Sequence, residues 1–172
     1  MNMIEAAKTC FAKFITFSGR ARRAEYWKFV LFNFLVTIAL VVVNSLIFGP
    51  TAETRYILDE AGNVTGVTNS LMYNGGYFTD IYSLIVLLPS LAVGWRRMHD
   101  SNRPGYLLFL PFIGMVLAIA LAFVGLPAIL AILAVLGCIA TWLYWLTRPS
   151  DPTTNRFGPP PSGTPHDPEI FA

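Results

Sequence analysis

Hydrophobic and polar positions alternate along this chain on a long scale, with extended apolar stretches separated by short charged segments. No charged residue lies between Phe29 and Ala52, and none lies between Arg103 and Arg148. The uncharged stretch Ile81–Trp95 is shorter, but the aromatic residues Tyr77 and Phe78 precede it. Apolar stretches of about 18 residues or more are typical of transmembrane helices. The pattern therefore predicts a membrane protein.

The last uncharged stretch is too long for one crossing. As a single helix, Tyr106–Leu146 would extend about 60 Å at a rise of about 1.5 Å per residue, about twice the thickness of the hydrocarbon core. Gly125 and Pro127 lie near its middle, where Gly followed by Pro favours the end of one helix and the start of another. We therefore expect an all-α membrane protein, a four-transmembrane-helix bundle with helices near residues 26–48, 78–95, 106–124 and 127–146.

The distribution of lysine and arginine predicts the orientation of these helices. Every lysine and arginine except Arg55 lies before or at the start of the first helix, in the predicted 96–105 loop, or after the fourth helix. The positive-inside rule therefore places the N-terminus and the C-terminus in the cytoplasm. The outer loop 49–77 contains two β-prone runs around a Gly/Asn turn, which favours a small β-hairpin.

Composition supports the same class of protein. Of the 172 residues, 55% are hydrophobic and 13% are charged, against about 25% charged residues in soluble domains. A disordered chain, a basic nucleic-acid-binding domain and an ordinary soluble enzyme are excluded. We expect one transmembrane domain over residues 1–160 and a flexible tail over 161–172. The two cysteines, Cys10 and Cys138, do not form a disulfide framework or a zinc site, and we expect neither a metal nor a cofactor.

Three polar clusters fall on the predicted cytoplasmic side. They read G-R-x-R-R-x-E-Y-W before the first helix, R-R-x-H-D after the second, and N-R-F-G-P in the tail. Their residues are Gly19, Arg20, Arg22, Arg23, Glu25, Tyr26 and Trp27; Arg96, Arg97, His99 and Asp100; and Asn155, Arg156, Phe157, Gly158 and Pro159. In order and content the three motifs resemble the YhaH-like family of bacterial inner-membrane proteins, defined by domain of unknown function 805. The resemblance implies a location in the inner membrane and supplies no reaction.

The basic residues of these clusters have two interpretations. Arg20, Arg22 and Arg23 obey the positive-inside rule, and Tyr26 and Trp27 suit the aromatic belt. Alternatively, the arginines recognise anionic lipid headgroups, since the guanidinium matches phosphate geometry. The acidic residues are more informative. We expect Glu25 and Asp100 to pair with arginines of other clusters, including Arg96, Arg97 or Arg156, and so to lock the first two helices and the tail together.

Two further segments carry packing signals. Small residues recur every fourth position in the third helix, and small residues of the fourth helix offer a matching groove. We expect close helix packing along Gly114, Ala118, Ala122, Ala134 and Cys138. Residues 3–15 have an amphipathic helical pattern, which is typical of a helix in the membrane interface and equally of a helix packed on the protein.

The sequence favours a non-enzymatic membrane scaffold or accessory protein, without a catalytic residue, whose basic face contacts anionic phospholipid of the bilayer. One alternative is a small transporter or a pore-forming subunit acting as an oligomer. Another is a membrane enzyme using His99 and Asp100, although adjacent residues on a helix do not face each other, and only His166 could add a second imidazole to a metal site. Nucleic acid is not an expected partner, and a homo-oligomer or an unknown membrane partner is left open.

Overall fold

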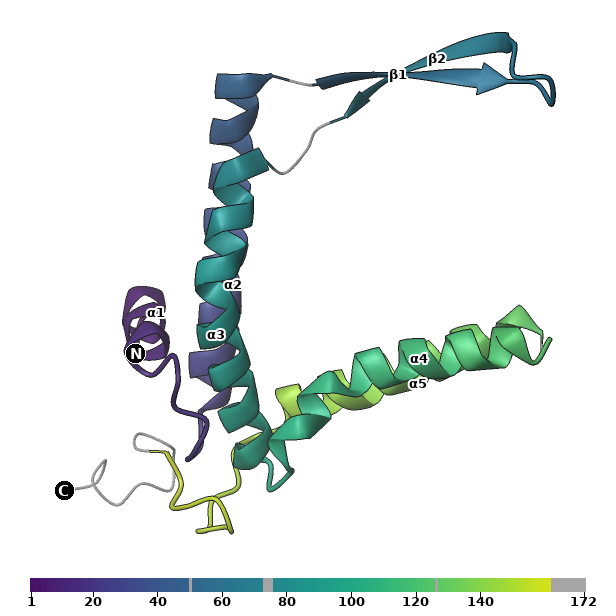
Figure 1. The fold of residues 1–172 in the computed structure, drawn as a ribbon. Helices are drawn as coiled ribbons and strands as arrows, with labels where there is room; N and C mark the ends of the chain where they lie inside the picture. The colour runs from purple at the N-terminus through teal and green to yellow at the C-terminus, as the bar shows by residue number, and fades with distance from the viewer. Residues whose placement is uncertain (50, 73–75, 126, 162–172) are drawn as a thin grey trace. The chain divides into compact units, whose positions relative to one another are not determined.

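The computed structural model describes residues 1–49, 51–72, 76–125 and 127–161 and is mostly helical (Figure 1). Residues 162–172, which hold His166 and almost all of the predicted flexible tail, lie outside the described residues. The elements follow the order α1 (Met3–Ala12), α2 (Arg23–Phe48), β1 (Thr51–Leu58), β2 (Val64–Met72), α3 (Gly76–Asp100), the 3-10 helix η1 (Gly105–Phe109), α4 (Leu110–Phe123) and α5 (Ala128–Thr147).

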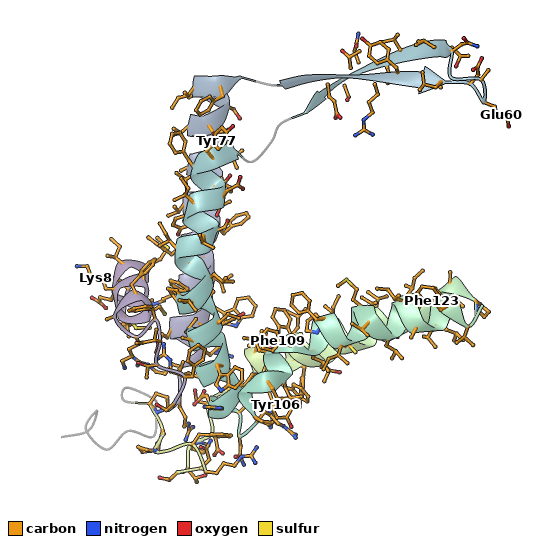
Figure 2. The ribbon with its side chains drawn as sticks, in the orientation of Figure 1. Lys8, Glu60, Tyr77, Tyr106, Phe109 and Phe123 are labelled. Atoms are coloured by element: carbon orange, nitrogen blue, oxygen red, sulfur yellow. The ribbon has the colours of Figure 1, made fainter. Side chains whose placement is uncertain are left out.

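Four helices of the described chain are long and apolar enough to cross a membrane, as the charge pattern predicts. They are Arg23–Phe48, Gly76–Asp100, Gly105–Phe123, which joins η1 to α4, and Ala128–Thr147. Figure 2 shows side chains projecting outward along these helices, and large apolar ones such as Phe34, Leu84 and Phe123 are 60%, 74% and 89% exposed. A helix that is apolar on all sides suits lipid as its solvent. The orientation of the termini stays a prediction.

The chain divides into two compact units, Met1–Phe32 with Leu88–Ala172 and Asn33–Leu87. The prediction of a single transmembrane domain over residues 1–160 stays a prediction. Within the second unit, the hydroxyl of Tyr82 on α3 donates a hydrogen bond to Oδ1 of Asn33 on α2 at 2.7 Å. Near the other end of that unit, the ring of Phe48 lies 6.1 Å from the ring of Tyr77. These contacts join α2 to α3 within the second unit.

The predicted β-hairpin is present and longer than its two β-prone runs. β1 and β2 are antiparallel, with Tyr56 opposite Val67 and an irregularity between Ile57 and Leu58. Asp59 organises the turn, because its Oδ1 accepts the backbone N–H groups of Ala61 and Asn63 at 3.0 and 2.8 Å. These hydrogen bonds hold the pKa of Asp59 below its ordinary value, with those from Asn63 contributing most. Side-chain caps of this kind are typical of Asp in turns.

The predicted start of the 96–105 loop is wrong, because α3 continues through the R-R-x-H-D motif to Asp100, and the connection to η1 is formed by residues 101–104. No helix breaker lies between Trp95 and Asp100, and the helix ends where Asn102 adopts a φ of 56° and Pro104 follows. α2 similarly begins at Arg23, three residues before the expected start at Tyr26. The R-R-x-H-D motif and the part of the first motif from Arg23 onward therefore lie on helices, where the 3.6-residue repeat fixes which side chains share a face, whereas Gly19, Arg20 and Arg22 lie in the segment before α2.

The α4–α5 hairpin confirms the predicted break and one predicted packing contact. Gly125 has a φ of +75°, and α5 starts directly after Pro127. A Cβ added to Gly114 would lie 2.9 Å from Cβ of Cys138, so the two helices approach closely there. Ala118 lines a shallow apolar groove together with residues 131, 132, 135 and 136 of α5. The contacts expected of Ala122 and Ala134 stay predictions.

Candidate functional site

The candidate site lies in the first unit, around the last turns of α3. From Ala92 to Asp100 every residue of α3 except Trp95 is buried. The surrounding core combines α1, α2, α3 and α5 and contains Ala7, Cys10, Ala21, Tyr26, Phe29, Val93, Met98 and Leu146. Four of the buried α3 residues are charged or polar, namely Arg96, Arg97, His99 and Asp100. Buried charges are stable only when other groups of the protein pair with them.

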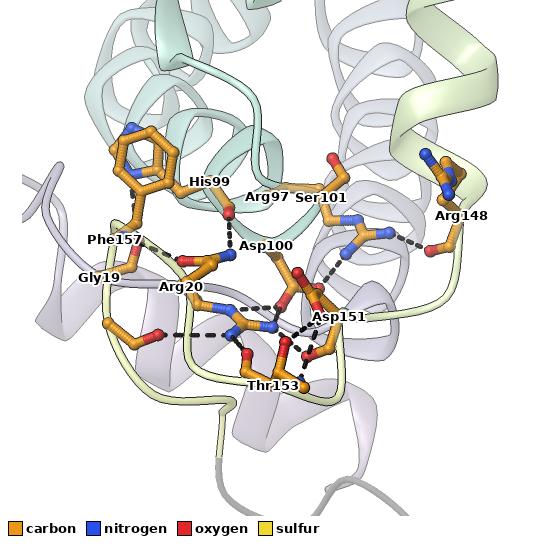
Figure 3. Close-up of polar contacts among 12 residues, drawn as sticks. Gly19, Arg20, Arg97, His99, Asp100, Ser101, Arg148, Asp151, Thr153 and Phe157 are labelled. Carbon is orange, nitrogen blue, oxygen red and sulfur yellow. Dashed lines mark hydrogen bonds and ion pairs between the residues drawn. The ribbon is translucent and has the colours of Figure 1, made fainter.

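Asp100 is the centre of a group that we call the arginine junction, which consists of Arg20, Glu25, Arg96, Arg97 and Asp100. Nε and Nη2 of Arg20 each lie 3.0 Å from Oδ1 of Asp100. Arg97 donates to the other oxygen, Oδ2, from one turn earlier on α3. The three side chains are at most 1% exposed. One carboxylate thus joins the segment before α2 to the end of α3 (Figure 3).

Glu25 and Arg96 form the third ion pair of the arginine junction. Nη1 of Arg96 lies 3.1 Å from Oε1 of Glu25, and these side chains are 2% and 9% exposed. Nε and Nη2 of Arg96 are buried and have no hydrogen-bond partner among the described residues. The prediction that Glu25 and Asp100 pair with arginines of other clusters is confirmed. Arg156 is not such a partner, since it donates to the carbonyl of Asn102 at 3.4 Å.

The end of α5 is fixed by side chains from α2 and α3. The last four carbonyl groups of a helix have no donor within the helix. The carbonyl of Leu146 accepts from Nε of Arg97 at 3.0 Å and from Nε1 of Trp27 at 3.3 Å. Arg97 also donates to the carbonyl of Arg148, and Arg23 donates to that of Thr147 at 3.4 Å. Two residues of the first motif and one of the second therefore cap α5.

The tail after α5 closes over Arg20. Nη1 of Arg20 donates to the carbonyl of Thr153 at 2.8 Å and, more weakly, to that of Gly158 at 3.4 Å. Nη2 of Arg20 donates to the carbonyl of Asp151, whose own backbone N–H donates to the carbonyl of Asp100 at 3.3 Å. The contacts of Asp151 and Thr153 are not predictable from the sequence, because a backbone carbonyl acceptor places no requirement on its side chain.

The N-R-F-G-P motif forms a tight turn that docks on His99. Asn155 and Gly158 exchange backbone hydrogen bonds of 3.2 and 3.0 Å, and Gly158 has a φ of +126°. Nδ2 of Asn155 donates to the carbonyl of His99 at 3.0 Å. The ring of Phe157 stacks on the imidazole with centroids 3.8 Å apart and an interplanar angle of 4°. Pro159, the last residue of the motif, is exposed.

His99 and Asp100 have different partners, so their adjacency in the sequence does not produce an acid–base pair. Nδ1 of His99 lies 3.1 Å from the carbonyl of Gly19, whose φ of +83° suits glycine. The carboxylate of Asp100 is bound by Arg20 and Arg97. Within the described ranges, no group of three or more His, Cys, Asp or Glu side chains could hold a metal ion.

α1 packs on this site through its small residues. Ala6, Ala7 and Cys10 are buried, and the ring of Phe11 meets that of Phe29 edge-on at 5.8 Å. Sγ of Cys10 lies 4.0 Å from Oε1 of Glu25. Burial first and the negative charge of Glu25 second raise the pKa of Cys10 to about 12, and the positive charge of Arg96 acts in the opposite direction. Of the two interpretations of this segment, packing on the protein is observed.

Burial separates the motif cations into two groups. Arg20, Arg96 and Arg97 are buried and face protein acceptors, so lipid headgroups do not reach them in this arrangement. Arg22 is partly buried and has contacts of its own. Tyr26 is buried against Trp27, with their rings 5.4 Å apart. The exposed cations of the first unit are Lys8, Lys13, Arg23, Arg103, Arg148 and Arg156.

Comparisons with known proteins place these features in a family. The family model described as "Protein of unknown function (DUF805)" matches residues 14–159. The chain is 36% identical to "Inner membrane protein YhaH" of Escherichia coli K12 over 109 residues, which cover 62% of this chain and 74% of the relative. It is also 36% identical to "Inner membrane protein YhaI" of the same strain over 104 residues, which cover 59% of this chain and 68% of that relative. No solved structure matches the chain.

Proposed function

The chain belongs to the DUF805 family of proteins of unknown function, and we propose that it is a non-enzymatic scaffold or accessory protein of the bacterial inner membrane whose basic end contacts anionic lipid. The inner-membrane names of its relatives and its four apolar helices support the location. The proposal combines a structural role for the buried motif residues with a lipid-contacting role for the exposed cations around them.

The shared carboxylate of Asp100 carries the structural part of this proposal. It binds Arg20 and Arg97, and these two arginines in turn hold the tail and the end of α5. A general base must be within reach of the proton that it removes, whereas Asp100 is fully buried and its oxygens are occupied by guanidinium groups. The motifs therefore join separate segments of the chain, which supports a structural role for them and not a catalytic one.

The lipid-contacting part follows from the exposed cations of the first unit. The positive-inside rule assigns this end of the helices to the cytoplasm, where the leaflet carries anionic lipid. Electrostatic attraction to such a surface contributes about 1 kcal/mol of binding free energy for each basic residue near it. Lys8, Lys13, Arg23 and Arg156 are exposed, so their charges are available to the membrane surface.

Native mass spectrometry of the full-length protein released from lipid nanodiscs tests this function. The nanodiscs contain phosphatidylglycerol and phosphatidylcholine in equal amounts, and we expect phosphatidylglycerol to be enriched in the released complexes. Lys8→Gln combined with Lys13→Gln should reduce this enrichment, whereas Arg55→Gln in the β-hairpin should leave it unchanged. Release of both lipids in their bulk ratio from the wild-type protein would overturn the lipid-contacting role.

The orientation has a separate test. A green fluorescent protein fused after Ala172 should fluoresce, because this reporter folds in the cytoplasm, and an alkaline phosphatase fused at the same position should be inactive. The opposite result would place the basic end outside the cell and would contradict the proposed contact with the cytoplasmic leaflet.

A further inference from the structure

The first unit contains a cavity that the arginine junction does not use. It lies between residues 101–103, which follow α3, and residues 148–152, which follow α5, and has a volume of about 530 Å³. We call it the loop cavity. Small-molecule sites have volumes of about 300–1,000 Å³. The loop cavity is therefore large enough for a polar headgroup, and two arginines line it.

The guanidinium groups of Arg103 and Arg148 are held by aromatic rings and are not paired with acids. Arg103 lies over the ring of Trp145, 5.3 Å from its centroid, and Arg148 lies over that of Tyr144 at 5.6 Å. Across the described residues, neither side chain makes an ion pair or a hydrogen bond. Stacking on a ring orients the guanidinium plane and leaves its N–H donors available.

The charge of the loop cavity favours an anion. Two arginines and one carboxylate, that of Asp151, line it. Oδ1 of Asp151 accepts from the backbone N–H and the hydroxyl of Thr153 at 3.2 and 2.9 Å. These bonds hold the pKa of Asp151 below its ordinary value, and Arg20 and Arg148 act in the same direction. The ionised cavity lining thus carries one net positive charge, with the carboxylate already bound to Thr153.

The position of the loop cavity suits a lipid. Arg148 directly follows the last residue of α5, and Arg103 comes two residues before η1 begins at Gly105. The two membrane-length helices Gly105–Phe123 and Ala128–Thr147 form a hairpin, so the ends away from its turn meet the same membrane surface. Aromatic residues such as Tyr144 and Trp145 are typical of the headgroup level.

We propose that the loop cavity binds the phosphate group of a phospholipid headgroup through Arg103 and Arg148. Guanidinium groups recognise phosphate by paired, charge-assisted hydrogen bonds. This inference rests on the lipid contact of the proposed function and adds a defined site to it. A soluble phosphate ester offers the same chemistry without the acyl chains, and the experiment separates these two sources.

The test measures binding of dioleoyl phosphatidylglycerol to the full-length protein in a neutral detergent, by native mass spectrometry and by the fluorescence of Trp145, which lies against Arg103. Glycerol 3-phosphate serves as the soluble probe. The double variant Arg103→Gln and Arg148→Gln should weaken lipid binding by about tenfold or more, since it removes both guanidinium groups that form charge-assisted hydrogen bonds with the phosphate. The double variant Lys8→Gln and Lys13→Gln removes the same charge outside the cavity. In a neutral detergent, which has no anionic membrane surface, it should weaken lipid binding by no more than about twofold, whereas in nanodiscs it reduces the diffuse contact.

Each outcome supports or overturns the proposal. Selective loss of lipid binding in the cavity variant, with the wild-type unfolding temperature retained, supports it. Equal losses in both double variants would show diffuse attraction of lipid, which overturns the cavity site and leaves the proposed lipid contact intact. Tight binding of glycerol 3-phosphate, lost in the cavity variant, would retain the phosphate site and overturn the lipid as its source. Absence of phosphatidylglycerol binding to the wild-type protein would overturn this site together with the lipid contact.

Discussion

The chain contains ion pairs in two opposite environments. In the arginine junction, Arg20 and Asp100 are 1% and 0% exposed, and Arg96 and Glu25 are 2% and 9% exposed. In the β-hairpin, Arg55 lies 3.3 Å from Glu53, but these side chains are 66% and 46% exposed. The distances are similar, so the difference between the two environments is the access of water.

The access of water decides how much each ion pair contributes to the free energy of unfolding. A surface pair contributes about 0–1 kcal/mol, because water already solvates both charges. A buried pair need not stabilise the fold relative to apolar residues, but loss of one partner costs about 3–5 kcal/mol, because the remaining charge is left buried and unpaired. The arginine junction should therefore be sensitive to removal of one charge, and the β-hairpin pair should not.

Asp100→Asn should cause the largest loss. The amide removes the negative charge that Arg20 and Arg97 share and leaves two buried guanidinium groups without a counterion. We expect the free energy of unfolding in detergent to fall by about 3–5 kcal/mol, measured by denaturant titration. A change below about 1 kcal/mol would show that water enters the arginine junction and that the comparison with the surface pair is wrong.

Glu25→Gln should have a similar but smaller effect of about 3 kcal/mol, because Glu25 has one arginine partner. Arg96 is then buried with a net charge and with Nε and Nη2 already unpartnered. The second substitution Arg96→Met should restore much of the lost stability, since it removes the orphaned charge and keeps an unbranched side chain. A double variant less stable than Glu25→Gln alone would contradict this explanation.

A packing change in the α4–α5 hairpin gives a reference without charges. Gly114→Leu would place a side chain where a Cβ alone already lies 2.9 Å from Cβ of Cys138. Overpacking of this kind costs about 1–3 kcal/mol, so the unfolding temperature in detergent should fall. Gly137→Leu on α5 is the matched control, because a Cβ there meets no atom within 4 Å. Equal effects of the two substitutions would rule out the close approach at Gly114.

The ionisation and reactivity of the Cys10 thiol depend on the arginine junction, because Sγ of Cys10 lies 4.0 Å from Oε1 of Glu25. The folded-state pKa of this thiol is raised to about 12, above the value of about 8.5 expected in the unfolded chain. A raised folded-state pKa favours the neutral thiol, so this contribution to stability is present below about pH 8.5 and is lost as the pH rises toward 12. We expect maleimide to react slowly with native Cys10 at about pH 8 and faster after Asp100→Asn. Rapid labelling of the wild-type protein would show that the site is open to water.

The sequence predicted the elements of this chain better than the partners of its motif residues. The charge-free stretches located all four membrane-length helices, because apolar length is a local property. The acidic residues within arginine clusters predicted that Glu25 and Asp100 pair with arginines of other clusters, because a buried charge requires an opposite charge beside it. Arg96 was among the expected partners, whereas Arg20 was not named as the partner of Asp100. The capping of α5 by Trp27 and Arg97 was not predictable, since its acceptor is a backbone carbonyl. The extension of α3 through Asp100 does not follow from hydropathy, because charged residues end the apolar stretch without ending the helix.

The smallest expected effect belongs to the β-hairpin. Glu53→Gln removes the partner of Arg55, but water replaces it at both side chains, so the unfolding free energy should change by less than about 0.5 kcal/mol. The measurement is the same denaturant titration that is used for Asp100→Asn, repeated at about 0.5 M salt. Salt screens exposed charges far more than buried ones, so the small effect of Glu53→Gln should vanish while that of Asp100→Asn persists. A salt-independent loss in Glu53→Gln would mean that the hairpin pair is shielded from water in the protein–detergent complex, and exposure would then no longer distinguish the two environments.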